Sequence, residues 1–320
     1  MSDSLVYIGK IISLEDIPNS DFISSATVVC GKGGKWKGVV TKTSYKEGDK
    51  CVVYLPDSLI PENEDMKFMA SSNWRVKMRR FRGAPSEVLI MPCHQNTSFE
   101  LGQDLTELFG VTKYQKPIPI GLQGDVEGEF PQFIPKTDEP NYQTNGDFIK
   151  DLIGKPYYIS EKCDGSSTTA YKYKGKFGVC SRNWELKRDE NNGYWKIALK
   201  YDLENTLPEG IALQWETCGP NIQLNKMGLK DISGFAFSAY DIENKEYLDL
   251  GKFELLCERI DFPRCRLIEI KKSFCDKNIH LLGEGKYENG NEREGVVVRS
   301  LENLGNKPIS FKVINLNYDN

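Results

Sequence analysis

The sequence predicts an α+β protein with two domains, a small β-barrel followed by a larger domain of antiparallel sheets with flanking helices. Three observations support this prediction. Short β-prone runs recur through residues 5–55, separated by turn-rich stretches. A segment rich in Pro, Gly and acidic residues then runs from Tyr114 to Asn145. Beyond it, strand-like runs are mixed with two stretches of helical period, and 320 residues are enough for two cores.

Composition excludes several classes of function. The net charge is −4 and the pI about 5.5, so a nucleic-acid surface would have to be a local patch. Nine cysteines are scattered without zinc-type spacing, which favours free thiols in a reducing, intracellular compartment. No apolar run reaches about 18 residues, so we expect no membrane partner. Only His94 and His280 are present, which argues against a histidine-centred triad or a multi-histidine metal site.

Residues 1–115 are expected to form an OB-type nucleic-acid-binding domain. Its strands are predicted at residues 5–9, 26–30, 36–40, 51–55 and 86–92. Strands this short at this spacing are typical of a small barrel of the OB type. Residues 31–35 are glycine-rich but lack the G-K-[ST] ending of a phosphate loop, so we interpret them as a hairpin turn.

A dense basic cluster lies at residues 75–82, with Trp74 and Phe81 interleaved. Cations beside aromatic rings suit a nucleic-acid backbone with a base stacked alongside, and a solvated charged hairpin is the alternative. On an OB barrel we favour the nucleic-acid interpretation. The five cations are Arg75, Lys77, Arg79, Arg80 and Arg82.

Residues 116–145 are expected to be a linker, with prolines at 117, 119 and 131. Its centre, residues 130–139, is too aromatic for an idle tether, so we expect it to pack on the domain that follows. That domain spans residues 146–320. Its strands are predicted around residues 157–161, 168–180, 211–216, 234–242, 295–299 and 309–314, and helices are predicted over 191–205 and 251–260.

The most suggestive stretch is Lys162-x-Asp164-Gly165, at the end of the β-prone run from Tyr157. A lysine held at a strand end can act as a nucleophile when its pKa is lowered. By itself the tetrapeptide is better explained as a hairpin edge with a solvated lysine. The blocks downstream favour the nucleophile interpretation over the hairpin edge, because each lies at or just after a predicted strand end.

Four further blocks follow in a fixed order: Ser181-Arg182-Asn183, Trp215-Glu216, residues 237–241, and Glu294-Gly295 with Lys312. The series resembles the covalent nucleotidyltransferase superfamily of ATP-dependent RNA ligases, DNA ligases and GTP-using capping enzymes. Residues 216–223, 237–242 and 294–299, the lead-in at 135–139 and the OB-type domain in front resemble RNA ligases with an amino-terminal OB domain. The resemblance covers nearly the whole chain and implies an ATP-grasp-like, DNA ligase/capping-enzyme fold for residues 146–320.

The resemblance implies an ATP-dependent RNA ligase that seals 3′-OH/5′-phosphate RNA ends or nicks. Lys162 would attack the α-phosphate of ATP, and AMP would pass from the lysine to a 5′-phosphate of RNA. A neighbouring 3′-OH would then displace AMP. An amine nucleophile must be neutral, so we expect nearby cations or a divalent metal to lower its pKa.

The same resemblance implies a role for each site residue. Asp164 and Glu294 would hold Mg²⁺ or Mn²⁺, partly through its waters. Phe237 would stack on adenine and Glu161 would accept a hydrogen bond from the adenine amino group. Arg182 and Glu216 would contact the ribose or the phosphates, and Lys312 would contact the α-phosphate.

One departure from the family pattern concerns the carboxyl end. Related ligases often carry two lysines one residue apart, whereas Ser310-Phe311-Lys312 offers one. Lys307 or a residue elsewhere could replace the second. The alternatives to an RNA ligase are a small ATP-dependent DNA ligase, a capping guanylyltransferase, and an OB-type nucleic-acid-binding protein with an inactive transferase domain. We expect RNA as partner, as a nicked duplex or RNA-terminated strands, with no obligate protein partner and a monomeric chain.

Overall fold

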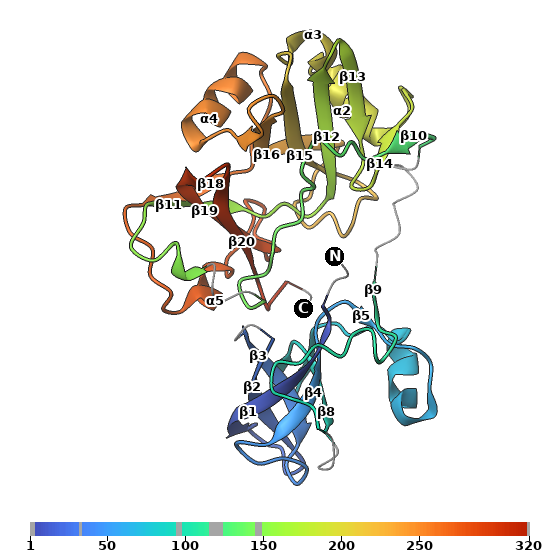
Figure 1. Cartoon of the computed structure of the whole chain (residues 1–320), viewed down its shortest axis with the longest axis vertical. Coiled ribbons are helices and arrows are strands. Elements are labelled where there is room, and N and C mark those ends of the chain that lie inside the picture. Colours follow the sequence, from blue (N-terminus) through green and yellow to red (C-terminus); the bar gives the residue numbers. More distant parts are fainter. Residues whose placement is uncertain (1–3, 32–33, 94–97, 115–123, 145–148, 319–320) are drawn as a thin grey trace. The chain divides into compact units, whose positions relative to one another are not determined.

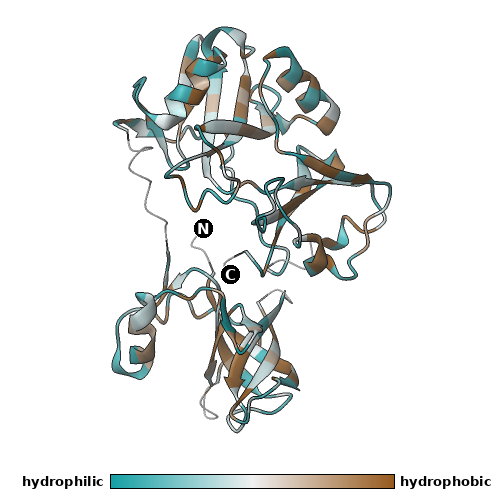
Figure 2. Ribbon diagram, turned by 180° about the vertical axis from the view of Figure 1, so that it is seen from behind, coloured by the Kyte–Doolittle hydropathy of each residue, from teal (hydrophilic) through white to brown (hydrophobic). Residues whose placement is uncertain are grey.

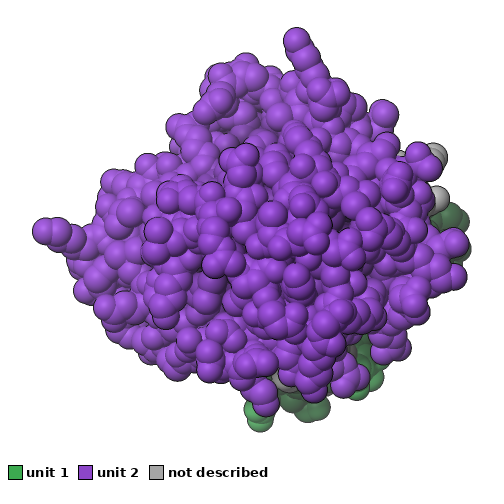
Figure 3. Space-filling view, turned by 90° about the horizontal axis from the view of Figure 1, so that it is seen from above, with its two compact units in different colours: residues 1–117, 142–147, 319 green, residues 118–141, 148–318, 320 purple. Residues whose placement is uncertain are grey.

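The computed structural model describes residues 4–31, 34–93, 98–114, 124–144 and 149–318. The chain forms two compact units, which Figure 3 colours separately. The first unit comprises residues 1–117 and 142–147, and the second comprises residues 118–141 and 148–318. The predicted α+β class is confirmed, because antiparallel sheets dominate both units and short helices accompany them (Figure 1).

The first unit is built on a five-stranded antiparallel sheet in the order β3-β2-β1-β4-β8. The two edge strands meet, because the Glu87 N–H just before β8 donates to the Lys37 carbonyl of β3 at 2.8 Å. This bond closes the sheet into a barrel. The strands are β1 (Val6–Asp16), β2 (Ile23–Cys30), β3 (Gly34–Thr41), β4 (Lys50–Tyr54) and β8 (Leu89–Pro92).

The remaining elements of this unit are short. The sequence prediction missed the 3₁₀ helix η1 (Glu64–Ser72), whose amino end is capped by the Asn63 side chain accepting from the Met66 N–H. Its residues lack a clear amphipathic period, so its only sequence signal is the Asn cap with Glu64 and Asp65 in the first turn. Two small antiparallel pairs complete the unit, β5 (Ser58–Leu59) with β9 (Thr112–Lys113), and β6 (Arg79–Phe81) with β7 (Ala84–Ser86).

The second unit contains two antiparallel sheets, one of seven strands in the order β10-β14-β13-β12-β15-β16-β17 and one of four in the order β18-β11-β19-β20. The larger sheet comprises β10 (Val126–Glu129), β12 (Ser166–Tyr173), β13 (Lys176–Cys180), β14 (Trp184–Leu186), β15 (Ile211–Cys218), β16 (Ser233–Asp241) and β17 (Glu246–Tyr247). The smaller comprises β11 (Tyr157–Glu161), β18 (Leu267–Lys271), β19 (Gly295–Leu304) and β20 (Lys307–Ile314). Every predicted strand of this half is present.

Of the two predicted helices, one is present with the predicted length and one is interrupted. The single helix expected over residues 191–205 is wrong, because α2 (Gly193–Lys200) ends before a separate turn of helix, α3 (Leu203–Thr206). Between them, Asp202 has a left-handed backbone with φ 47°, which interrupts the helical hydrogen bonds although the apolar period of the sequence continues. Helix α4 (Leu250–Arg259) agrees with the prediction over 251–260 to within one residue, and the preceding Asp249 caps it by accepting from the Lys252 N–H. A last short helix, α5 (Ile279–Leu282), precedes β19.

The two faces of the larger sheet are covered differently. Helices α2 and α4 pack on one face, where Trp215 and Leu213 of β15 are fully buried. On the other face Phe130 and Ile134 pack against Tyr171 and Ala212, so the aromatic segment at residues 130–139 lies on this unit. Apolar residues, brown in Figure 2, lie mainly on the strands and polar residues on the connecting loops. Among the described residues no helix is long and apolar enough to cross a membrane.

Replacing Leu213 tests the importance of this core. Leu213→Ala removes a side chain of 0 % exposure and should lower the free energy of unfolding of this unit by about 2–5 kcal/mol. Leu255→Ala, at a position 67 % exposed on α4, should change it by less than about 0.5 kcal/mol. Urea unfolding followed by tryptophan fluorescence measures both, since Trp195 and Trp215 belong to this core. Equal effects of the two variants would contradict the assignment of the core.

Candidate functional site

Lys162 lies immediately after the fully buried strand β11, in the smaller sheet of the second unit. Its N–H donates to the Gly295 carbonyl at 3.1 Å, which continues the pairing of β11 with β19 by one residue. Its Nζ lies 2.8 Å from Glu294 Oε2, and the two side chains are only 23 % and 18 % exposed. Two blocks that are 132 positions apart in the sequence, at 162 and 294, therefore meet as an ion pair between neighbouring strand ends.

The turn after Lys162 brings a second carboxylate into place. Asp164 is 3 % exposed and its Oδ2 accepts from the Leu224 N–H at 3.2 Å. Gly165 follows, where a Cβ would lie 2.4 Å from the Thr217 carbonyl oxygen and 2.8 Å from Glu216 Cγ. Only glycine lets the turn approach β15 this closely, which explains the Asp-Gly pair after the lysine.

The charge environment of Lys162 differs from the expectation. Burial alone would lower the pKa of Lys162, but Glu294, Glu216 and Asp164 outweigh it and raise the pKa above its ordinary value. The prediction that nearby cations lower this pKa is therefore wrong, whereas a lowering by a divalent metal stays a prediction. The physical reason is that carboxylates, rather than cations, surround the ammonium group.

Strand register shows which other residues share the face of Lys162. Side chains alternate along β11, so Ser160 and Lys162 lie on one face and Glu161 on the other. Ser160 is opposite Val297 of β19, and Val297 is opposite Lys312 of β20. Lys312 is therefore on the same face as Lys162, two strands away.

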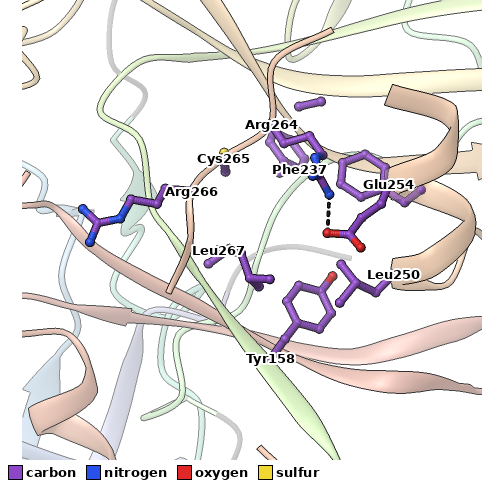
Figure 4. Close-up of a pocket in the computed structure, with 11 residues that line it drawn as sticks. Tyr158, Phe237, Leu250, Glu254, Arg264, Cys265, Arg266 and Leu267 are labelled. Atoms are coloured by element: carbon purple, nitrogen blue, oxygen red, sulfur yellow. Dashed lines mark hydrogen bonds and ion pairs between the residues drawn. The ribbon is translucent and has the colours of Figure 1, made fainter. Parts of the chain in front are cut away.

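A cavity of about 290 Å³ opens beside this face, between the two sheets of the unit. Tyr158 and Ser160 of β11 line one side and Phe237 of β16 lines another. Figure 4 shows Tyr158 and Phe237 on opposite sides, with Leu250 and Glu254 between them. Leu250, Phe253 and Leu267 make the cavity partly apolar, while Arg264 and Glu254 form an ion pair in its wall. An aromatic ring, apolar walls and a few polar groups are typical of a small-molecule pocket.

Arg299 holds Phe237 in its position at the cavity. The guanidinium group donates to the Phe237 carbonyl at 2.5 Å, lies 5.7 Å from the centre of its ring, and pairs with Glu139. Arg299 is only 4 % exposed. Arg299 carries no recognisable signal in the sequence, because an arginine in a strand is indistinguishable from an edge cation until its partners are known.

Glu161 lies apart from the other predicted ligand residues. Its side chain is on the face opposite Lys162, with one carboxylate oxygen 3.9 Å from Arg266. Arg266 points away from the cavity in Figure 4. Burial raises the pKa of Glu161 above its ordinary value, although Arg266 and Arg293 oppose this. The period-2 alternation of β11 could have shown in advance that neighbours 161 and 162 face opposite ways.

Arg182 and Glu216 lie on the larger sheet. Glu216 is opposite Ser167 and Phe235 in the β12–β15–β16 ladder, on the sheet face away from α2 and α4. Arg182 is half-exposed and its Nη2 lies 2.5 Å from Asp138 of the lead-in segment. The structure thus places Arg182 at the surface of the unit, already engaged with a carboxylate.

The acidic residues are suited to a hydrated divalent cation. No group of three or more His, Cys, Asp or Glu side chains stands ready to hold a metal within the described ranges. Mg²⁺ and Mn²⁺ nevertheless prefer carboxylate oxygens, and Mg²⁺ keeps several waters and needs only one or two protein carboxylates. Asp164, Glu216 and Glu294, all acting on one ammonium group, supply that chemistry.

The basic cluster of the first unit is only partly available to a ligand. Arg75 makes a two-pronged contact with Asp57, at 2.6 and 3.1 Å, and stacks 3.8 Å from the centre of the Tyr114 ring. Arg82 donates to the Asn19 carbonyl at 2.6 Å and Arg80 to Gly83 at 2.8 Å. Lys77 and Arg79 are exposed. Arg75 therefore serves the structure of the unit, and Lys77 and Arg79 are the best placed for phosphates.

Comparison with known proteins gives matches over nearly the whole chain. A model of the RNA ligase family matches residues 155–314, and a model of an OB-fold domain matches residues 5–93. No match was found among curated proteins. The predicted OB-type barrel and nucleotidyltransferase fold are confirmed by these matches and by the solved structures that follow.

Solved structures of Naegleria gruberi RNA ligase resemble this chain closely. A lysine-to-alanine variant with ATP and Mn has a TM-score of 0.85 at 30% identity, covering 97% of this chain and 96% of that one. A lysine-to-methionine variant with AMP and Mn has a TM-score of 0.85 at 30% identity, covering 98% and 97%. The same ligase with PPi has a TM-score of 0.84 at 30% identity, covering 98% and 96%.

The buried carboxylate of Glu161 gives a pH dependence that can be measured. Because its folded pKa is raised, the folded protein binds more protons than the unfolded chain just above the unfolded value of about 4.3. The contribution of Glu161 to stability is therefore greatest at acid pH and falls as pH rises through the folded pKa. Glu161→Gln should lose that dependence, so its Tm relative to the parent should increase between pH 4 and pH 8 in thermal unfolding. A constant difference in Tm would contradict the burial of the charge.

Proposed function

This chain belongs to the RNA ligase family and is an ATP-dependent RNA ligase, and from that premise we propose that Lys162 is its nucleophile. Lys162 Nζ would form a bond to the α-phosphorus of ATP as the bond to the bridging oxygen of the β-phosphate breaks. Pyrophosphate leaves with that electron pair, and Nζ loses a proton. AMP then moves to the 5′-phosphate of RNA, and the 3′-OH of the neighbouring end displaces it to form the phosphodiester.

One observation carries this proposal most strongly. The Lys162 ammonium group is 2.8 Å from Glu294 on the face of the smaller sheet that borders the cavity with Phe237. Ser160, two residues before Lys162 and on the same face, lines that cavity. A base held against Phe237 would therefore place its phosphates along β11 toward Lys162, as in-line attack requires.

The carboxylates around Lys162 link the nucleophile to the metal. Asp164 and Glu294, with Glu216 nearby, are the residues that would hold Mg²⁺ or Mn²⁺. A divalent cation bound there would offset their negative charge, lower the pKa of Lys162 toward the neutral amine and polarise the phosphate oxygens. Before binding, the same carboxylates keep Lys162 protonated and in place.

The other ligand contacts follow from position. Glu216 lies on the sheet face that the helices leave free and suits the ribose hydroxyls. Arg182 could reach the ribose or a phosphate only by releasing Asp138. We leave the Glu161 side chain out of the adenine contact, because strand alternation turns it away from the face of Lys162.

Lys312 is proposed to bind the α-phosphate. It lies opposite Val297, on the face of Lys162. Lys307 does not replace the second lysine of the family pattern, because it is opposite Leu304 at the far end of the β19–β20 hairpin. Five positions along a strand separate the two lysines by about 17 Å. Contact to the leaving pyrophosphate would then come from a different element.

The substrate is RNA, and we propose that the amino-terminal domain, residues 1–115, grips a nicked duplex or RNA-terminated strands. Residues 116–145 would connect it to the catalytic domain at 146–320, although 116–123 and 145–148 lie outside the described residues. Lys77, Arg79 and Arg82 are the exposed cations of the basic cluster, and of these Arg82 already donates to the Asn19 carbonyl. We propose that the chain works as a monomer without an obligate protein partner.

Labelling with a radioactive nucleotide tests the nucleophile. The parent protein incubated with ATP labelled at the α-phosphate and Mn²⁺ should retain label on a denaturing gel, whereas GTP should give none. Lys162→Ala should reduce the label at least about 100-fold, because no other amine occupies this position. Chelation of the metal should abolish it as well.

The control for this experiment is Lys174→Ala, at the tip of the β12–β13 hairpin, which should label like the parent. Undiminished labelling of Lys162→Ala would refute the assignment of the nucleophile. If the parent takes no label from ATP, a pyrophosphate chase distinguishes a pre-adenylylated preparation from an inactive transferase domain.

A second prediction concerns RNA binding. The double variant Lys77→Ala/Arg79→Ala should join nicked RNA about tenfold more slowly at limiting RNA, and its log–log salt dependence should become shallower by about 2, one for each lost phosphate contact. Lysyl-AMP formation should stay within about twofold of the parent. Lys46→Ala/Lys67→Ala removes two other exposed lysines of the same unit and should leave both steps unchanged. Equal loss of both steps in the first variant would refute the division of labour between the domains.

A further inference from the structure

A buried tyrosine connects the two strand ends that carry Lys162 and Glu294. Tyr287, 4 % exposed, lies between α5 and β19. Its hydroxyl donates to the Lys162 carbonyl at 2.9 Å and accepts from the Glu294 N–H at 3.2 Å. One hydroxyl group thus bonds to the backbone of the nucleophile and to the backbone of the carboxylate paired with it.

The position of this hydroxyl within the sheet explains its importance. The regular β11–β19 pairing ends at Glu161 opposite Val296, and the bond from the Lys162 N–H to the Gly295 carbonyl adds one more link. At Gly295 the backbone has φ +150°, and a Cβ there would lie 2.2 Å from the Val313 carbonyl. Beyond this point, the Glu294 N–H and the Lys162 carbonyl are joined through the tyrosine oxygen.

We propose that Tyr287 is a positioning residue for lysyl-AMP formation, which sets the separation and orientation of Lys162 and Glu294 through their backbones. This inference rests on the proposed function of Lys162. The hydroxyl does not touch the reacting atoms. It takes the place of the next ladder hydrogen bond, where both side chains leave the sheet. Without it, the partly buried Glu294 N–H and Lys162 carbonyl would lose this partner.

The turn that carries Tyr287 is itself fixed to the loop that holds Asp164. The Tyr287 N–H donates to the Asn291 carbonyl at 2.8 Å, which closes a tight turn. From that turn the side chains of Asn289 and Asn291 each donate to the Lys226 carbonyl at 2.8 Å. Two residues before Lys226, the Leu224 N–H donates to Asp164. The Tyr287 turn is therefore linked by hydrogen bonds to the segments that carry Lys162, Asp164 and Glu294.

Single-turnover labelling of Tyr287→Phe tests the proposal, because this change removes only the hydroxyl group. The rate constant for lysyl-AMP formation at saturating ATP should fall by about 10- to 100-fold, since a displacement of about 1 Å at a reacting group costs that much. The ATP concentration for half-maximal rate should change less than about threefold. The Mn²⁺ concentration for half-maximal rate should rise, because the backbone of Glu294 loses its anchor.

A matched control separates positioning from general stability. Tyr171 is 2 % exposed and its hydroxyl bonds to Glu185 at 2.9 Å, outside the site. Tyr171→Phe loses a comparable buried hydrogen bond and should keep the parental rate and metal dependence. A similar drop in rate for both variants, or a rate for Tyr287→Phe within about twofold of the parent, would overturn the proposal.

A second variant covers the case in which Tyr287→Phe does not fold. Asn289→Ala/Asn291→Ala changes two exposed side chains and loosens the turn while the hydroxyl remains. It should slow lysyl-AMP formation about threefold or more, and an unchanged rate would overturn the proposal. Each series includes the parent and Lys162→Ala. If label does not depend on Lys162, the proposed function fails, and this inference fails with it.

Discussion

The ion pair between Lys162 and Glu294 is the interaction on which the rest of the site depends. An ammonium group at a largely buried strand end would be unfavourable alone, because burial lowers its pKa and disfavours the charge. Three carboxylates from three separate segments compensate for it. Those segments must therefore meet at one point. Three features meet that requirement: Gly165 in the turn after Lys162, Gly295 where β19 passes close to Val313, and the register of β11 against β19. The charge balance also keeps the carboxylates together before a metal binds.

The cavity depends on a second buried ion pair. Arg299 lies on the face of Ser160 and Val297 and joins β19 to the Phe237 carbonyl of the larger sheet and to Glu139 of the lead-in segment. A buried pair of this kind contributes little net stability, because desolvation offsets the attraction. Its contribution here is geometric. It connects the two sheets of the unit at the point where Phe237 faces the cavity, and it attaches the end of the segment that Phe130 and Ile134 pack onto the larger sheet.

The sequence predicts much of this arrangement because chemistry-bearing residues sit at strand ends, and strand ends can be read from the apolar runs before them. Lys162, Asp164, Glu216 and Glu294 come together as that reading implies. Other predictions fail where tertiary partners decide. Arg75 is bound by Asp57 and Tyr114, which are 18 and 39 positions away from it. The break at Asp202 leaves no trace in the apolar period that predicts a single helix. The face of Glu161, by contrast, follows from the alternation of side chains along β11.

Tyr287 illustrates why positioning residues are harder to find than reacting ones. A reacting side chain must carry a particular group, so residue type and order along the chain identify it. Positioning can be achieved by any donor or acceptor that reaches the right backbone atoms, so residue type carries little information. Tyr287 lies in a polar stretch, Tyr287-Glu288-Asn289-Gly290, that predicts an exposed turn. Its hydroxyl is buried because the β11–β19 ladder opens at Gly295, and that opening exists because Lys162 and Glu294 must project from the sheet at the same place. Because Lys162 and Glu294 both leave the sheet at this end of the ladder, their backbones do not bond to each other there. The Tyr287 hydroxyl from a neighbouring turn makes the two hydrogen bonds instead.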